Sequence, residues 1–205
     1  MKKIIYSILT LSLGLVLSSG SCSPDAIDPD GVLINGIVWA RYNVDTPGTF
    51  AATPESPGMV YQWNRKTGWS LNDPLTPIPS GKTWETTKSP ATVWDAINDP
   101  CPTGWRVPSK ADFDKLVAAN NTWNNVAKGR LFFGSGVEQI FLPAAGRRSF
   151  VSNLQSVGTY GFYWAKEESS ASSAYFLTFD SSSKANFSSG NDKCAAQSVR
   201  CVKTK

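Results

Sequence analysis

Short apolar runs separated by turn residues dominate this chain, a pattern that is typical of β structure. The first two runs flank Asn35-Gly36, a pair typical of two-residue hairpin turns, and we expect the second strand to continue through residues 41–44. Residues 60–64 predict another short strand, and residues 93–97 predict one helical turn. Between these two segments, several Pro and Gly residues exclude regular structure: Pro74, Pro77, Pro79 and Gly81.

One segment follows a helical period instead. The turn before it, Cys101-Pro-Thr-Gly104, fits a type I turn with Pro second and Gly fourth. Ser109 and Asp112 then have the spacing of a capping box, with Asp replacing the usual Glu. The following apolar residues lie at i, i+3 and i+4, as on the buried side of a helix: Phe113, Leu116 and Val117. We therefore predict a helix over about residues 109–120, ended by Asn120-Asn121.

After the helix, the apolar runs become short and strand-like again, and their spacing predicts antiparallel hairpins. The expected strands are residues 130–133, 138–142, 161–166, 174–179, 184–187 and 197–202. With the helix, they predict a single α+β domain over residues 31–205, with a mixed, mostly antiparallel sheet and long loops.

Residues 1–21 predict a signal peptide. Lys2-Lys3 supplies its positive start, and an apolar stretch too short for a spanning helix follows. Small residues precede Cys22, as in a bacterial lipoprotein, so we expect Cys22 to carry lipid; a secretory signal with an incidental cysteine is the alternative. Residues 22–30 form an acidic, Pro-containing tether that resembles the surface-export signals of Bacteroidetes lipoproteins. The expected location is the outer membrane, exposed at the cell surface.

Composition and charge argue against several functions. The 205 residues have a formal net charge of +4 without a visible basic cluster, so no nucleic-acid partner is expected. The absence of His excludes Ser-His-Asp triads and histidine metal sites. Glu167 and Glu168 are neighbours on a predicted strand and point to opposite faces, and Asp180 and Glu138 are their possible partners in a glycosidase pair. Such exposed carboxylates are usually only solvated, so we expect no enzyme, no metal and no cofactor.

Three cysteines remain if Cys22 is lipidated. The expected compartment is oxidising, so one disulfide and one free thiol are predicted. We choose Cys101–Cys201, because both lie in ordered segments and their bond would hold the end of the chain against its middle. Cys194 would then be free, and Cys194–Cys201 is the alternative pairing.

Six motifs in a fixed order resemble a known family. They are Val38-Trp39-Ala40, Tyr61-Gln62-Trp63, Cys101-Pro-Thr-Gly-Trp-Arg-Val-Pro-Ser109, Phe141-Leu-Pro-Ala-Ala-Gly-Arg147, Gly161-Phe-Tyr-Trp164 and Ser198-Val-Arg-Cys-Val202. The series is similar to the Fibrobacter succinogenes major paralogous domain, which occurs on bacterial lipoproteins and surface proteins. The resemblance covers nearly all of residues 31–203 and implies a fold similar to C-type lectins. In some members of this family the C-terminal face is diversified by retroelements.

The family motifs also predict the positions of several large side chains. Three Trp residues are expected in the core: Trp39, Trp105 and Trp164. Arg106 and Arg200 are expected to pair with buried acids or backbone carbonyls. Trp69 and Trp84 lie in Pro- and Gly-rich loops, where they could form exposed platforms for sugars or pack beneath a long loop.

The candidate ligand-binding region is residues 149–194. It is rich in Ser and aromatic residues with scattered Asn, a composition that antibody paratopes also use; a plain solvated sheet surface is the alternative. Fold analogy and this composition select seven residues for ligand contact: Tyr160, Phe162, Lys166, Tyr175, Asn186, Phe187 and Asp192.

These observations predict a surface-anchored lipoprotein that binds a protein or glycan ligand through its C-terminal strands and loops. The alternative is a structural or adhesin subunit of the cell envelope without a dedicated small ligand.

Overall fold

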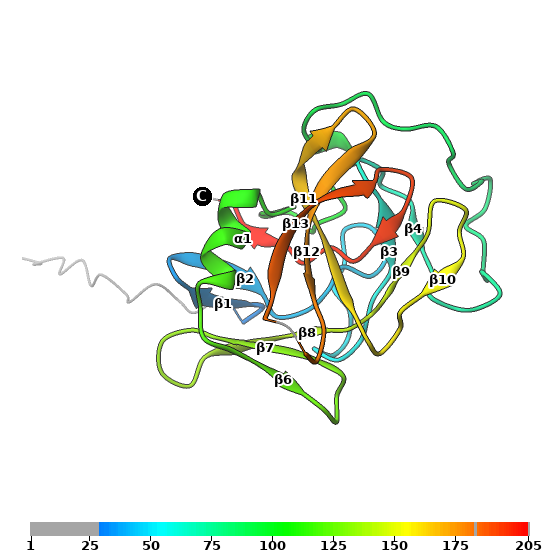
Figure 1. The fold of residues 1–205 in the computed structure, drawn as a ribbon. Helices are drawn as coiled ribbons and strands as arrows, with labels where there is room; N and C mark the ends of the chain where they lie inside the picture. Colours follow the sequence, from blue (N-terminus) through cyan, green and yellow to red (C-terminus); the bar gives the residue numbers. More distant parts are fainter. Residues whose placement is uncertain (1–28, 183, 205) are drawn as a thin grey trace, which may run out of the picture.

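The computed structural model describes residues 29–182 and 184–204. The predicted signal peptide, Cys22 and most of the tether lie outside the described residues. In the described part, mostly antiparallel strands form four small sheets beside one α-helix, α1 (Lys110–Val117), which confirms the α+β prediction (Figure 1). No helix in that part is long and apolar enough to span a bilayer.

The first sheet joins both ends of the domain. Its strands, in spatial order, are β1 (Gly31–Ile34), β2 (Ile37–Ala40), β15 (Val202–Lys203) and β5 (Trp105–Arg106). The predicted hairpin is confirmed: Asn35 and Gly36 have φ angles of 47° and 79°, the left-handed geometry that its turn needs. The predicted continuation through residues 41–44 is wrong, because the carbonyls of Ala40 and Arg41 accept hydrogen bonds from the buried Arg200 side chain instead of a neighbouring strand.

The second sheet lies on the side of the molecule away from α1 (Figure 1). Its spatial order is β10 (Leu154–Gln155), β9 (Arg147–Arg148), β14 (Ala196–Gln197), β3 (Val60–Gln62) and β4 (Gly68–Trp69). The strand expected over residues 197–202 is divided between β14 and β15, because the chain crosses from this sheet to the first one at residues 198–201. At this crossing, Tyr163 and Ser198 form an isolated parallel bridge.

Two further sheets complete the architecture. The long strands β11 (Gly161–Ser170), β12 (Ser173–Phe179) and β13 (Asn186–Asp192) form an antiparallel meander, and α1 packs beside β13 (Figure 1). The other sheet contains β6 (Asn121–Asn124), β7 (Gly129–Phe133) and β8 (Gln139–Pro143). Strand β6 was not predicted, since its sequence Asn-Thr-Trp-Asn is polar and follows the helix directly.

The turn that begins near Cys101 and the helix that follows it are close to their predictions. The Ser109 hydroxyl accepts from the Asp112 N–H and the Asp112 carboxylate accepts from the Ser109 N–H, so the capping box is confirmed. Helix α1 is shorter than expected because Ala118 already caps its C-terminus. The preceding turn was placed one residue too early: the Trp105 N–H donates to the Pro102 carbonyl, and Gly104 is the third residue with φ 83°. This positive φ is typical of a type II turn. The helical turn expected at residues 93–97 is a 3₁₀ turn, η1 (Ala96–Asn98).

Covalent and polar contacts lock the two ends of the domain together. A disulfide joins Cys101 to Cys201, as predicted, while Cys194 is a buried free thiol. The fully buried Arg200 donates to the side-chain oxygen of Asn43 and to three backbone carbonyls. Burial lowers the pKa of Arg200 to about 10, which still leaves it charged at neutral pH. Arg106 pairs with the buried Asp112 at 2.8 Å, so the predicted arginine pairings are confirmed.

The tryptophans fill the core as expected. The three motif residues are all buried: Trp39, Trp105 and Trp164. Trp69 is also buried, and its ring centroid lies 5.2 Å from that of Trp84. The Trp84 indole N–H donates to the carbonyl of Phe150. Of the two expectations for Trp69 and Trp84, packing beneath a loop is therefore the correct one.

Candidate functional site

The seven residues predicted to bind a ligand do not lie on a single surface. In the antiparallel register of the long sheet, Phe187 is opposite Leu177, and Phe162 is opposite Thr178. Leu177 and Thr178 are neighbours on β12, and neighbouring strand residues point to opposite faces. Phe162 and Phe187 therefore belong to different faces of this sheet.

Tyr175 and Phe187 lie on the face that packs against α1. Their rings are stacked with centroids 5.3 Å apart, and Phe187 is 6.2 Å from Phe113 of the helix. The Lys110 ammonium lies 4.9 Å from the Phe187 centroid. Both aromatic residues are partly buried and pack against the main core cluster, so they support the scaffold.

Tyr160 immediately precedes β11 and Phe162 is the second residue of that strand; their rings form a second stack, with centroids 5.8 Å apart. Phe162 is buried, and the Arg147 guanidinium lies 4.7 Å from its ring centroid. Tyr160 is 41% exposed, so its ring is open to a ligand while Phe162 supports it from below the surface.

The remaining three predicted residues are dispersed. Lys166 is half-buried, and its backbone N–H donates to the Pro108 carbonyl. Asn186 is exposed at the beginning of β13. Asp192, at the end of the same strand, forms an ion pair of 3.2 Å with Lys88 and accepts from the Cys194 N–H. These positions are too different to form one contact surface with Tyr160.

Tyr160 lines a cavity between three loops. The loops are the β6–β7 turn, the segment before β11 and the β12–β13 turn. The cavity measures about 270 Å³. We call it the loop cavity; its lining is Trp123, Asn125, Lys128, Gly158, Thr159, Tyr160, Asp180, Ser181 and Ser182.

A buried arginine connects two walls of the loop cavity. Arg130 of β7 donates to the Asn121 side chain at 2.6 Å and to the Asp180 backbone carbonyl at 2.9 Å. It is 5% exposed, and this burial lowers its pKa, while the charge of Asp180 acts in the opposite direction. The β6–β7 hairpin and the β12–β13 turn are thus fixed relative to each other.

Local hydrogen bonds order the loops themselves. The Asn124 side-chain oxygen accepts from two backbone N–H groups, those of Val126 and Ala127. The Trp123 indole N–H donates to the Asn125 side chain at 3.0 Å. Asp180 accepts from both the N–H and the hydroxyl of Ser182. Such side-chain hydrogen bonds are typical of Asx turns, and they stabilise a loop that has no regular β-sheet hydrogen bonds.

The chemistry of the loop cavity suits a small polyhydroxylated ligand. Trp123 and Tyr160 supply two aromatic rings with apolar faces, as in many pockets that enclose small molecules. Asp180, Asn125 and Lys128 supply a carboxylate, an amide and an ammonium group within the same lining. Together these residues offer hydrogen-bond acceptors and donors for the hydroxyl groups of such a ligand. The aromatic rings beside them offer surfaces on which its apolar C–H groups can pack.

Sequence reasoning found only one wall of this cavity. Tyr160 was predicted, whereas Trp123 and Asn125 lie on the unpredicted strand β6 and the turn after it. Asp180 was considered as a possible partner in a carboxylate pair. One signal was present: a lone Trp between polar residues in Asn-Thr-Trp-Asn-Asn is unusual for a segment that only ends a helix.

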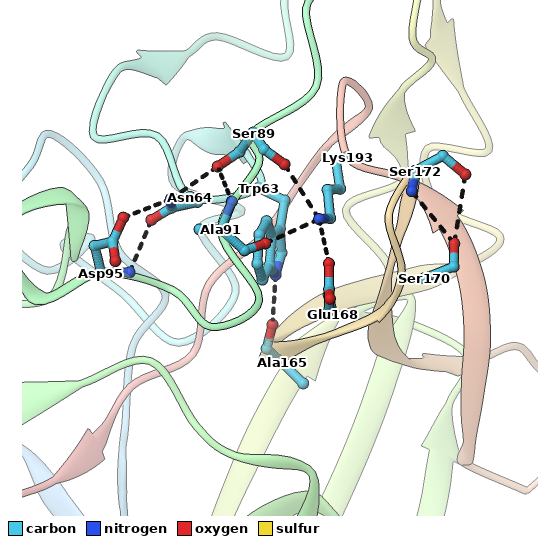
Figure 2. Close-up of polar contacts among 10 residues, drawn as sticks. All are labelled: Trp63, Asn64, Ser89, Ala91, Asp95, Ala165, Glu168, Ser170, Ser172 and Lys193. Carbon is cyan, nitrogen blue, oxygen red and sulfur yellow. Dashed lines mark hydrogen bonds and ion pairs between the residues drawn. The ribbon is translucent and has the colours of Figure 1, made fainter.

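A second polar cluster surrounds the fully buried Lys193, immediately after β13. Its ammonium donates to the carbonyls of Ser89 and Ala91 at 3.2 and 3.0 Å and to the Glu168 carboxylate at 2.7 Å, as Figure 2 shows. The same nitrogen lies 4.6 Å from the Trp63 ring centroid. These three contacts use all three N–H donors of the ammonium, so none remains for a substrate. Its position makes it a clamp between the loop containing residues 89–91 and strand β11.

The acidic residues that could have formed a hydrolytic pair are separated and engaged elsewhere. Glu138 pairs with Arg41 at 3.1 Å, Glu167 accepts from the Lys110 N–H, and Glu168 holds Lys193. Among the described residues, no three Asp, Glu or Cys side chains are grouped so that they could hold a metal ion.

Comparison of the chain with protein-family models, curated proteins and solved structures gave no match. The geometry of the loop cavity is therefore the main basis for a functional conclusion.

Proposed function

We propose that this chain is a binding module that recognises a glycan through the loop cavity. The observation that carries the proposal is the placement of Trp123 and Tyr160 in one cavity with the carboxylate of Asp180. The cavity size suits one sugar residue of a longer chain, with the flanking sugars lying over the exposed turns. The six motifs support a C-type-lectin-like fold for the domain, and this fold is part of the proposal.

The proposal includes anchoring at the cell surface. Small residues before Cys22 and the acidic tether after it support lipidation of this cysteine and display on the outer membrane. Metabolic labelling with an alkyne fatty acid tests this part: the native chain should incorporate label and Cys22→Ala should not. Label that persists in Cys22→Ala would contradict a lipid at this position.

A glycan array probed with the purified chain tests the main proposal. We expect binding to a restricted set of glycans, weakened at least roughly tenfold in Trp123→Ala and in Tyr160→Ala, because each substitution removes one aromatic contact surface. Phe150→Ala is the matched control, since Phe150 is an exposed aromatic residue, 57% accessible, that does not line the cavity. Equal binding by all four proteins would place the glycan elsewhere.

A protein ligand or a purely structural role gives different results on arrays of glycans and of surface proteins. A structural or adhesin subunit should bind no glycan on the array at any practical concentration. A protein ligand should bind the native chain in a surface-protein array and lose affinity with the same two substitutions.

Comparison of copies of the gene tests the further idea of a diversified face, which predicts substitutions concentrated in residues 149–194.

A further inference from the structure

Two hollows adjoin each other beside the β3–β4 turn. The first, about 430 Å³, is lined on one side by apolar residues: Pro47, Met59 and Pro79. The second, about 260 Å³, is lined by polar and charged side chains that include Gln62, Arg65 and Glu85. Three residues line both hollows: Lys66, Thr67 and Lys82. We call the combined feature the β3–β4 groove.

The groove carries excess positive charge. Its cations are Arg65, Lys66 and Lys82, and among the described residues Glu85 supplies the only lining carboxylate. None of the three cations forms an ion pair with another described residue. Burial raises the pKa of the nearby Asp99 and the charge of Lys66 acts in the opposite direction, but the Asp99 carboxylate already accepts the N–H groups of Cys101 and Val107.

A buried asparagine holds the turn that carries two of these cations. Asn64 is 2% exposed and has φ 57°, a left-handed conformation that Asn tolerates better than most residues. Its amide nitrogen donates to the Ser89 hydroxyl and to Asp95, and its oxygen accepts from the Asp95 N–H (Figure 2). The same oxygen accepts from the side-chain amide of Asn98. Arg65 and Lys66 follow directly, so the scaffold fixes their backbone.

The opposite wall is held by a second buried amide. The Gln62 side chain donates to the carbonyls of Glu85 and Cys194, each at 2.7 Å, and accepts from the Glu85 N–H at 3.3 Å. A turn with Gly81 at φ 68° precedes this contact, and in it the Lys82 N–H donates to the Pro79 carbonyl. The backbone beneath Lys82 is therefore also held in place.

A glycine leaves room for one wall of the apolar hollow. A Cβ atom on Gly68 would lie 2.6 Å from the Met59 sulfur and 3.2 Å from the Tyr61 hydroxyl. Gly68 thus lets Met59 lie against the backbone of β4, where it forms part of the hollow. Met is a flexible, polarizable side chain that adapts to apolar ligands.

We propose that the β3–β4 groove binds an amphipathic anion, which is a phosphate or carboxylate group joined to a short acyl or aryl chain. The polar hollow receives the anionic group beside Lys66, Lys82 and Arg65, and the apolar hollow receives the chain beside Met59. Both parts are needed, because exposed lysines hold an isolated anion only weakly in water. The proposal is independent of the glycan function, since the two cavities share no lining residue.

Two-dimensional amide NMR of the purified chain, titrated with octyl phosphate below its micelle concentration, tests this proposal. We expect shifts concentrated in residues 65–68 and 79–85, and binding at least roughly tenfold tighter than for inorganic phosphate or octanol, since each lacks one half of the ligand. Equal affinity for octanol or for inorganic phosphate overturns the proposal. Shifts confined to other parts of the chain also overturn it.

A charge-neutralising variant provides the second measurement. Lys66→Gln/Lys82→Gln should bind octyl phosphate at least roughly tenfold more weakly, because both substitutions remove a cation from the polar hollow. Lys115→Gln, an exposed lysine on α1, is the control and should bind like the native chain. Unchanged affinity in the double variant overturns the proposal.

Vesicles distinguish the two sources of such an anion. Sedimentation with phosphatidylglycerol vesicles that depends on Lys66 and Lys82 identifies a lipid headgroup as the ligand. Binding of monomeric octyl phosphate without such sedimentation identifies a soluble amphipathic anion. Either result supports the groove, provided that the double variant loses binding.

Discussion

The ammonium of Lys193 lies 2.7 Å from the Glu168 carboxylate, and the lysine side chain is fully buried while the glutamate side chain is 24% exposed. The same ammonium satisfies the carbonyls of Ser89 and Ala91. This contact joins three parts of the chain that are distant in sequence. The arrangement indicates a stabilising role rather than a catalytic one, because no donor of the ammonium remains for a substrate.

Lys193→Met is therefore expected to reduce the free energy of unfolding by about 3 kcal/mol, because it leaves two buried carbonyls without a donor and Glu168 without its partner. Urea denaturation followed by tryptophan fluorescence measures the change. Lys115→Met, at an exposed helix position, should change stability by less than about 0.5 kcal/mol. A loss below about 1 kcal/mol for Lys193→Met would show that the clamp is unimportant.

The disulfide between Cys101 and Cys201 spans 100 residues of sequence. In the loop-entropy model a bond of this span stabilises the folded chain by about 4–5 kcal/mol, since it restricts the unfolded chain. Cys101→Ser/Cys201→Ser should lose stability of that order in urea denaturation, and a reducing agent should destabilise the native chain without affecting this variant. Cys194→Ala serves as the control: it should keep the full effect of the reducing agent, because Cys194 is a free thiol.

The sequence predicts those parts of the fold that depend on neighbouring residues. The Asn35-Gly36 turn and the Ser109 cap are local signals, and the structure contains both. The end of β2 could not be predicted, because it depends on Arg200. This residue lies about 160 positions away, and its side chain donates a hydrogen bond to the Ala40 carbonyl. When contacts with distant residues determine where a strand ends, the neighbouring sequence carries no signal for that end.

The candidate site illustrates the same limit. Composition indicated the C-terminal region and identified Tyr160, but it could not show that Phe187 faces α1 while Phe162 faces the other way. That division depends on strand register, which is set by pairing between β12 and its two neighbours. Trp123, a residue distant in sequence from Tyr160, reaches the cavity from the β6–β7 hairpin, which Arg130 connects to the β12–β13 turn.

Asp112 gives a prediction for pH dependence. Burial alone raises the pKa of this carboxyl group, but hydrogen bonds from Arg106 and Ser109 outweigh burial and hold its pKa below the ordinary 3.8. A lowered pKa in the folded state means that the carboxylate stabilises the fold above its unfolded pKa, and this contribution disappears as pH falls through the folded value. The native chain should therefore lose this stability as the pH falls below the ordinary 3.8 and through the lower folded value.

Urea denaturation of native and Asp112→Asn chains at a series of pH values measures this contribution. The difference in unfolding free energy should be largest near pH 6 and should shrink as the native carboxyl group becomes protonated. Asp114→Asn is the matched control on the same helix, because Asp114 is exposed and forms a surface ion pair with Lys110. A difference for Asp112→Asn that stays constant from pH 6 to about pH 2 would contradict the lowered pKa.

Arg130 is expected to act on ligand binding without touching the ligand. Its guanidinium joins Asn121 to the Asp180 carbonyl, and it is absent from the lining of the loop cavity. Arg130→Lys keeps the charge but loses the planar group that reaches both partners at once. We expect a glycan affinity at least roughly fivefold lower, because the two walls are no longer fixed relative to each other and part of the binding energy orders them.

Amide NMR distinguishes this positioning effect from general destabilisation. In Arg130→Lys, shift changes and faster hydrogen exchange should be confined to the β6–β7 hairpin and the β12–β13 turn, while amides of α1 remain as in the native chain. Lys128→Gln provides the contrast: Lys128 lines the cavity, so its substitution should lower affinity without altering exchange in either loop. Native affinity in Arg130→Lys together with loosened loops would show that the cavity walls need not be held together for binding, and the role assigned to Arg130 would then be wrong.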